Sequence, residues 1–289
     1  MPVEAHPGGK ESQGGHHQRA TGTYHFHDGP LVGQTFASKA AGSAALAAGE
    51  IGSAEAPSSM ASTMPAGDLA EYLPAIDEGD QIVVHTGFTL SYSEPHEQAE
   101  WGGAYLVTAE RLRGGVKRTD NFRIDPAVTT GSAVLGDYRG SGYDRGHLAP
   151  AASMAWSKEA MSESFFLSNM SPQKPGFNRG IWKKLEEAVR DMARQHGTVV
   201  VVTGPVLEDG LAEIGPSGLD IPRAYYKVVL DVTEPTIEGI AFVLRNETSK
   251  KPLGRFAVTI DYVEEVTGIN FFEALEDGLE ERVEGSYSV

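Results

Sequence analysis

The sequence predicts a layered α/β (α+β) fold, in which helices pack against a central sheet. Two observations indicate this class. Residues 199–203 and 239–244 are short and almost continuously apolar, which is typical of strands buried on both faces. Residues 179–195 carry apolar side chains at helical spacing, and Gly197 follows their end. Strand-like segments on either side of an amphipathic helix place that helix on one face of a sheet.

The expected elements follow from local composition, taken in chain order. Strand composition, rich in β-branched and aromatic residues, occurs at 81–86, 104–108, 199–203, 225–232 and 239–244. The helix at 179–195 places Ile181, Leu185, Ala188, Val189 and Met192 on one face. We expect a shorter helix at 260–266 and a second short one near 271–275.

The two ends of the chain differ from its middle. Residues 1–66 are rich in Gly, Ala, Ser and His, so we expect a disordered low-complexity tail. Residues 67–275 are predicted to form one folded domain, and residues 276–289 an acidic C-terminal tail. Residues 31–51 are alanine-rich but are interrupted by Lys39 and Glu50, which is a poor match to a signal peptide. The sequence has no apolar run of about 18 residues, so we expect no membrane span.

Composition excludes some chemistry and leaves other chemistry open. The chain has no cysteine, which excludes disulfides, thiolate zinc sites and cysteine nucleophiles. The net charge of −16 is unusual for a protein that binds a polyanion. However, residues 264–289 contain eight acidic residues against one basic residue, and basic residues gather between positions 111 and 184. The net charge therefore does not exclude a locally positive cleft.

The segment 140–150, Gly-Ser-Gly-Tyr-Asp-Arg-Gly-His-Leu-Ala-Pro, holds the first candidate site. Its glycines and its proline are typical of a tightly bent loop that fixes His147 in place. A neutral imidazole can accept a proton from water, and Arg145 beside it can bind a phosphate or pair with Asp144. The alternative is a loop histidine that is hydrogen-bonded only for structure.

A second candidate site lies along the predicted helix. Asn178, Trp182, Glu186 and Arg190 are spaced four residues apart, which makes a slanted stripe on a helix and predicts a row facing a cleft edge. An amide oxygen and a carboxylate suit a hard cation such as Mg²⁺. The alternatives are a helix cap for Asn178 and an ordinary salt pair between Glu186 and Arg190.

Three blocks together resemble the DNA/RNA non-specific endonuclease family. They are Asp-Arg-Gly-His at 144–147, Ser-Asn-Met-Ser-Pro-Gln at 168–173 and Asn-x-Gly-x-Trp-x-x-Leu-Glu at 178–186. The resemblance runs from about residue 75 to residue 275. It implies an α/β/α sandwich with a largely antiparallel central sheet and a ββα-metal active site.

The resemblance also implies roles for particular residues. His147 would be the general base that activates a water molecule. Asn178 would be the one direct protein ligand of Mg²⁺, with Mn²⁺ or another divalent cation as the alternative. Glu186 would hold metal-bound waters, and Arg190 would steady the phosphate.

Three further residues belong to the predicted site. The resemblance makes Arg118 a second phosphate ligand and gives Arg145 a supporting role for the loop or the substrate. Asn169 would orient His147 or the metal shell.

The function that follows is Mg²⁺-dependent hydrolysis of phosphodiester bonds in DNA and RNA, with little sequence specificity. Two alternatives stay open: a catalytically inactive nuclease fold that only binds, and a phosphodiesterase acting on small nucleotides. A homodimer and, from the family, a secreted or periplasmic location are further hypotheses.

Overall fold

A computed structural model describes residues 15–18, 23–26, 35–36, 69, 72–76, 81–233 and 237–286. Within the first 66 residues it contains a small antiparallel sheet of β1 (Gly15–Gln18), β2 (Thr23–Phe26) and β3 (Thr35–Phe36). The other residues of that segment lie outside the described part, so the disordered tail stays a prediction.

The main sheet has seven strands and is antiparallel throughout. Its order is β14-β13-β12-β9-β6-β5-β4, and every neighbouring pair is antiparallel. The strands are β4 (Gln81–Val84), β5 (Thr89–Ser93), β6 (Gln98–Thr108), β9 (Thr198–Pro205), β12 (Ala224–Asp231), β13 (Glu238–Arg245) and β14 (Ala257–Val258). Two small sheets pair β7 (Asp144–His147) with β8 (Met170–Gln173), and β10 (Glu213–Ile214) with β11 (Leu219–Asp220). The predicted largely antiparallel sheet is therefore confirmed.

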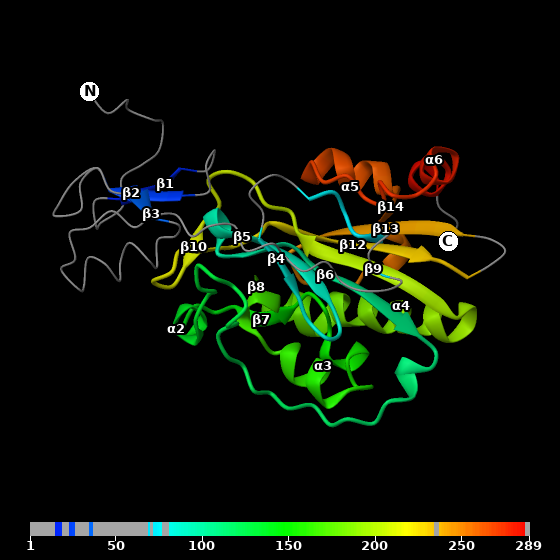
Figure 1. The fold of residues 1–289 in the computed structure, drawn as a ribbon, viewed down its shortest axis with the longest axis horizontal. Coiled ribbons are helices and arrows are strands. Elements are labelled where there is room, and N and C mark those ends of the chain that lie inside the picture. Colours follow the sequence, from blue (N-terminus) through cyan, green and yellow to red (C-terminus); the bar gives the residue numbers. More distant parts are fainter. Residues whose placement is uncertain are drawn as a thin grey trace.

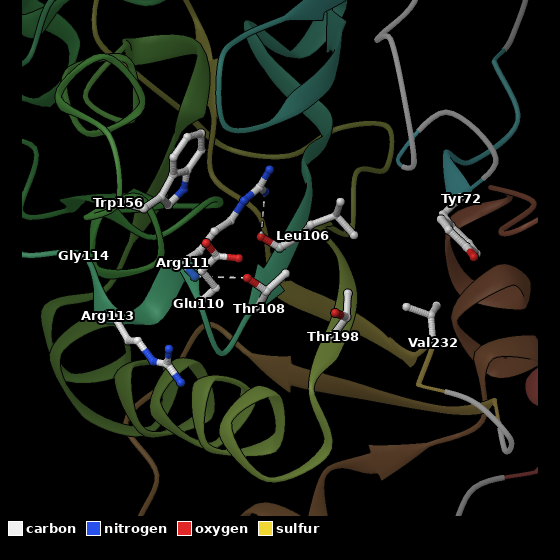
Figure 2. Close-up of a pocket in the computed structure, with 10 residues that line it drawn as sticks. All are labelled: Tyr72, Leu106, Thr108, Glu110, Arg111, Arg113, Gly114, Trp156, Thr198 and Val232. Atoms are coloured by element: carbon white, nitrogen blue, oxygen red, sulfur yellow. Dashed lines mark hydrogen bonds between the residues drawn. The ribbon is translucent and has the colours of Figure 1, made fainter.

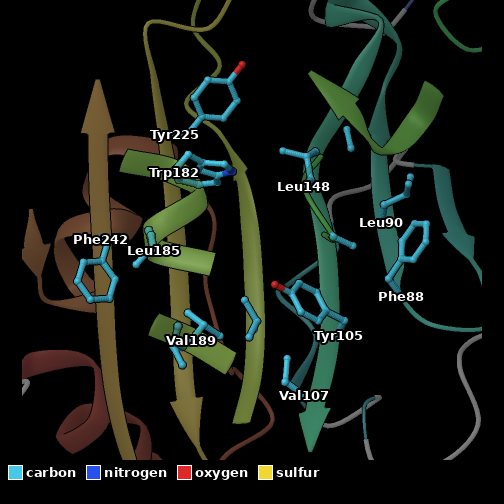
Figure 3. Packing of buried hydrophobic residues seen from close by; sticks show 14 of the residues in the cluster. Phe88, Leu90, Tyr105, Val107, Leu148, Trp182, Leu185, Val189, Tyr225 and Phe242 are labelled. Carbon is cyan, nitrogen blue, oxygen red and sulfur yellow. The ribbon is translucent and has the colours of Figure 1, made fainter. Parts of the chain in front are cut away.

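Helices cover both faces of the main sheet (Figure 1). On one face α4 (Lys183–His196) packs Leu185, Val189 and Ala193 against alternate residues of β9, β12 and β13. On the other face α5 (Ile260–Thr267) and α6 (Asp277–Gly285) pack against the intervening residues of the same strands. Figure 3 shows Trp182, Leu185 and Val189 close to Tyr225 and Phe242 in the first of these cores. Because side chains alternate along a strand, each of these strands supplies both cores.

Shorter helices complete the fold. They are α2 (Leu135–Tyr138), α3 (Lys158–Glu163) and the 3₁₀ turns Glu94–His96, Arg111–Arg113, Ala151–Ser153, Leu167–Asn169 and Leu253–Arg255. Ser157 caps α3 by accepting hydrogen bonds from the backbone N–H groups of Glu159 and Ala160.

The predicted helix at 179–195 is two helices joined at a kink. Residues Phe177–Trp182 form a π-helix, Gly180 has φ −106° and ψ −107°, and α4 begins at Lys183. The wider π turn changes which residues share a face. Trp182 and Arg190 are also buried, so the expected row of four side chains facing a cleft edge is wrong.

Three other expectations differ from the structure. Residues 144–147 are a strand and not a bent loop, because Asp144 to His147 pair with Gln173 to Met170. Residues 271–275 are not helical; Phe272 has φ +58°, a left-handed conformation that interrupts a helix and buries both Phe271 and Phe272. The segment predicted as an acidic tail contains α6, whose Val283 is only 2% exposed against the main sheet.

Candidate active site

His147 is positioned by the antiparallel pairing of β7 with β8. His147 pairs with Met170, and the backbone N–H of Leu148 donates to the carbonyl of Asn169 at 3.1 Å. A Cβ at Gly146 would lie 2.1 Å from Cδ of Gln173, so a larger residue there would have to displace this buried side chain. The histidine therefore sits on a paired strand whose backbone is fixed by its neighbour.

Asn169 fixes the backbone that follows His147. Its Oδ1 accepts from the N–H of Ala149 at 2.9 Å, and its Nδ2 donates to the carbonyls of Ala149 and Ser164, both at 2.9 Å. The side chain is fully buried. An orienting role through the backbone of residues 147–149 fits these contacts, and the role of Asn169 in a metal shell stays a prediction.

The imidazole of His147 lies between two aromatic rings, each next to a guanidinium. The rings of Phe165 and Phe122 meet it edge-on, at centroid distances of 5.0 and 6.0 Å. Arg118 lies 4.7 Å from the centroid of Phe165, and Arg145 lies 4.0 Å from that of Phe122. Burial, followed by the positive charges of Arg118 and Arg145, lowers the pKa of His147 to about 3. The imidazole is therefore neutral near pH 7.

The Nε2 atom of His147 is buried and, among the described residues, has no hydrogen-bond partner. A buried polar atom without a partner is costly unless a ligand or water completes it. The alternative of a histidine that is hydrogen-bonded only for structure therefore loses support at this nitrogen.

Asn178 lies opposite the start of β7. Its Nδ2 donates to Oδ2 of Asp144 at 2.9 Å, and Arg179 binds the same carboxylate with Nε and Nη2 at 2.8 and 2.6 Å. This bond directs the amide group so that Oδ1 remains for another partner. The helix-cap alternative is wrong, because the π-helix begins after Gly176 and has no side-chain cap.

A groove of about 510 Å³ brings several predicted residues together. Arg118, Arg145 and Asn178 line it, together with Phe122, which contacts His147. Arg139 and Arg179 add positive charge, while Asp120 and Asp144 pair with Arg118 and Arg179 respectively. The groove is thus locally basic in a chain whose net charge is −16.

Glu186 and Arg190 lie further along the helix and do not line this groove. Glu186 is half-buried and Arg190 is 9% exposed. Within the described chain the two form no ion pair closer than 4.0 Å, so the ordinary salt-pair alternative is wrong. Burial raises the pKa of Glu186 to about 7, against the opposing charges of Lys227 and Arg190.

A family comparison explains why these features occur together. A model described as DNA/RNA non-specific endonuclease matches residues 66–278, which include every predicted site residue.

The chain belongs to this family.

Known relatives agree with that membership. Human mitochondrial endonuclease G is 37% identical over 221 residues, covering 71% of this chain and 73% of that protein. Nuclease C1 of Cunninghamella echinulata var. echinulata is 36% identical over 206 residues, covering 65% of this chain and 81% of its own. The crystal structure of the EndoG/EndoGI complex aligns with a TM-score of 0.68 at 29% identity, covering 76% of this chain and 96% of that one. The chain is therefore a nuclease-family hydrolase, similar to endonuclease G.

Lys227 is a residue of this nuclease that sequence reasoning missed. It is fully buried on β12, where its Nζ donates to Oγ1 of Thr203 at 2.5 Å and lies 4.8 Å from the ring centroid of Trp182. Burial lowers its pKa to about 7, and the charge of Glu186 opposes this shift. The available signal was a single lysine inside the apolar run 225–230, where a charge on either face must be buried.

A hollow larger than this groove lies elsewhere in the described part of this nuclease. It has a volume of about 840 Å³ and is lined by the ends of β6 and β9 and by the turn at Arg111–Arg113. Figure 2 shows Arg111 turned toward the backbone of Leu106, to whose carbonyl it donates at 3.2 Å. This hollow contains none of the predicted site residues, so a choice of site by volume alone would not select them.

No helix within the described ranges is both long enough and apolar enough to cross a bilayer.

Proposed function

We propose that this nuclease is a divalent-cation-dependent endonuclease that hydrolyses phosphodiester bonds of DNA and RNA with little sequence preference. The observation that carries this proposal is the basic groove beside His147. Its lining offers guanidinium groups for a phosphate, and the neighbouring imidazole is uncharged and has a nitrogen without a partner.

His147 is the general base in this proposal. Its Nε2 takes a proton from the attacking water, which needs the neutral imidazole that the low pKa provides. The charges of Arg118 and Arg145 contribute to that low pKa. A phosphate bound between them would offset both charges, so the basicity of His147 would rise when substrate is in place.

The residues present fit a hard divalent cation such as Mg²⁺. The Oδ1 atom of Asn178 is directed away from Asp144 by the Nδ2 hydrogen bond, and the carboxylate of Asp144 adds negative charge nearby. One neutral protein oxygen suits an ion that keeps most of its waters. When bound, such an ion stabilises negative charge on the phosphate and on the leaving oxygen. Asn178 would hold it, and Asp144 would orient Asn178.

Glu186, Arg190 and Lys227 form a group of interacting charges that does not line the groove. Glu186 would hold waters of the ion when it is ionised. Lys227 and Arg190 both favour that ionised form, since their charges lower a pKa that burial raises. Because Arg190 is only 9% exposed, we propose that it acts through the effect of its charge on Glu186. Arg118 and Arg145 would bind the phosphate.

Low sequence preference follows from the same lining. Guanidinium groups that contact phosphate position a nucleic acid but carry no information about its bases. The proposed contacts of Arg118 and Arg145 are of this kind.

A plasmid-nicking assay tests the proposal. The full chain should convert supercoiled plasmid to nicked and linear forms in Mg²⁺, should degrade single-stranded RNA, and should do neither in EDTA. Binding without cleavage would support an inactive nuclease fold. Cleavage of bis(p-nitrophenyl) phosphate with intact plasmid would support a phosphodiesterase acting on small substrates.

A further inference from the structure

Three carboxylates gather on the face of the main sheet opposite α4. Asp261 and Glu264 lie on α5 and Glu284 lies on α6, and one oxygen of each is within 4.8 Å of the others. Figure 1 shows α5 and α6 side by side on this face. We call these three residues the α5–α6 triad.

Tight packing fixes α6, and with it Glu284, against the sheet. Val283 is 2% exposed within the second core. Gly239 of β13 makes this approach feasible, because a Cβ there would lie 2.5 Å from the carbonyl oxygen of Val283. The neighbouring residue Glu284 is therefore held in place by the fold.

Glu284 is buried without a partner for one of its oxygens. The residue is 7% exposed, and in the described part of the chain its Oε1 accepts no hydrogen bond. Its carboxylate faces two more carboxylates, and no basic group of the described residues bonds to its buried Oε1. A buried carboxylate in such surroundings is stable only with a bound proton or a bound cation.

We propose that the α5–α6 triad binds a hard divalent cation, with Ca²⁺ preferred over Mg²⁺. Carboxylate oxygens are the ligands that both ions accept, but Ca²⁺ takes six to eight oxygens at about 2.3–2.6 Å in flexible geometry. Mg²⁺ keeps several waters and is usually held by one or two carboxylates. Three carboxylates with oxygens within 4.8 Å of one another are more than Mg²⁺ usually takes, so their number favours the larger ion.

The surroundings leave room for the rest of a coordination shell. Glu264 uses Oε1 to accept from the N–H of Phe271 at 2.8 Å, which leaves its other oxygen. A hollow of about 530 Å³, lined by Asp261, Glu280, Glu281, Arg282 and Glu284, opens beside the triad and gives water access. Gly285 and Ser286 complete that lining, in which Arg282 is the basic residue and four residues are acidic.

Burial and repulsion between carboxylates raise the pKa values of Glu264 and Glu284, and a cation would relieve this repulsion. Burial, then the charges of Glu264, Glu280 and Asp261, raises the pKa of Glu284 to about 8. Burial, with Asp261 and Glu280 as further causes, also raises the pKa of Glu264. A bound cation would offset this repulsion and would join α6 to α5. Most of α6 lies beyond residues 66–278 that the family model matches, and the triad lies across the sheet from the catalytic groove.

The test is a thermal melt of the full chain carrying Asn178→Ala, so that the proposed catalytic ion does not contribute. Melts are recorded in EDTA, in Ca²⁺ and in Mg²⁺. With Ca²⁺ at a hundredfold excess over its Kd, we expect a rise in Tm of about 5–10 °C. We expect Ca²⁺ to reach half of this effect at a lower concentration than Mg²⁺.

Two further variants in the same background make the test specific. Glu284→Gln should abolish the rise, and in EDTA it should melt no lower than its parent, because it removes a repelled carboxylate. Glu265→Gln removes an exposed charge from α5, the helix that carries Asp261 and Glu264, and should keep the full rise. No rise with either ion, or an equal rise in Glu284→Gln, would overturn the site. A response to Mg²⁺ at lower concentration than to Ca²⁺ would overturn the preference for calcium.

Discussion

The two faces of the main sheet carry opposite charge arrangements. On the α4 face, Lys227 and Arg190 lie buried beside one carboxylate, Glu186. On the α5–α6 face, Asp261, Glu264 and Glu284 lie together, and among the described residues Oε1 of the buried Glu284 has no hydrogen-bond partner. The same strands serve both faces, since Lys227 alternates with Tyr226 and Val228, which pack in the second core. The first face supplies basic residues that act on its buried carboxylate, whereas on the second face no described ion pair joins a basic residue to the triad.

This difference indicates where each charge acts. Protein cations on the α4 face favour an ionised Glu186, which a site for hydrolysis can use at neutral pH. The acids on the other face favour a bound proton or a bound cation. Changes on the first face should therefore alter catalysis, and changes on the second should alter stability.

The largest expected effect is on the α4 face, at His147. His147→Ala should lower kcat/KM on plasmid DNA by about 10²–10⁴-fold, since general-base catalysis contributes that much. DNA binding, measured by fluorescence anisotropy, should stay within a few-fold. His196→Ala is the matched control, because that exposed histidine pairs with Asp231 at the end of α4. Wild-type activity in His147→Ala would remove it from the mechanism.

The next effect concerns the cation at the groove. Asn178→Ala should raise the Mg²⁺ concentration needed for half-maximal activity by about 10–100-fold, because even indirect partners of a metal cost that much. A thermal melt in EDTA should change little, since Asn178 caps no helix. An unchanged Mg²⁺ midpoint would show that another group holds the ion.

A smaller effect is expected from the buried lysine. Lys227→Met keeps the volume of the side chain but removes the charge that most lowers the pKa of Glu186. That pKa, about 7 in the intact protein, should rise, so Glu186 would be protonated at neutral pH. Activity at pH 7 should fall about fivefold for the first unit of the shift and about tenfold for each further unit.

The pH profile of kcat/KM distinguishes a raised pKa of Glu186 from a loss of packing at Lys227. The acid limb of kcat/KM should move to higher pH in Lys227→Met, and activity should recover as the pH rises. Lys184→Met, which removes an exposed lysine of α4, should leave the limb in place. A uniform loss at every pH would indicate that Lys227 acts only through packing.

The smallest effect on activity is expected on the far face. Gly239→Ala should leave kcat/KM within about twofold but lower Tm by a few degrees, because overpacking costs about 1–3 kcal/mol. The added Cβ would lie 2.5 Å from the carbonyl of Val283 and would displace α6. Gly278→Ala, where a Cβ contacts nothing within 4 Å, is the control and should not lower Tm. Equal Tm values for the two variants would show that α6 is not tightly packed.

The sequence by itself determined the pattern of the sheet and the family. Apolar runs placed β9, β12 and β13 to within one or two residues, because a strand buried on both faces must be apolar at successive positions. It also singled out His147 and Asn178 as candidate site residues, since their motifs are short and contiguous. The strand at 144–147 was missed because its pairing depends on Met170 to Gln173, beyond the reach of local composition.

Only the tertiary structure decided the electrostatic environment of these residues. A lysine in an apolar run does not reveal that it faces Glu186 from another element, and a four-residue spacing does not reveal the kink at Gly180. Likewise, the acidic end of the sequence suggests a solvated tail until Val283 is seen against the sheet. Composition reports how many charges a segment carries. The energy of a charge depends on burial and on its neighbours in space, and distant parts of the chain supply both.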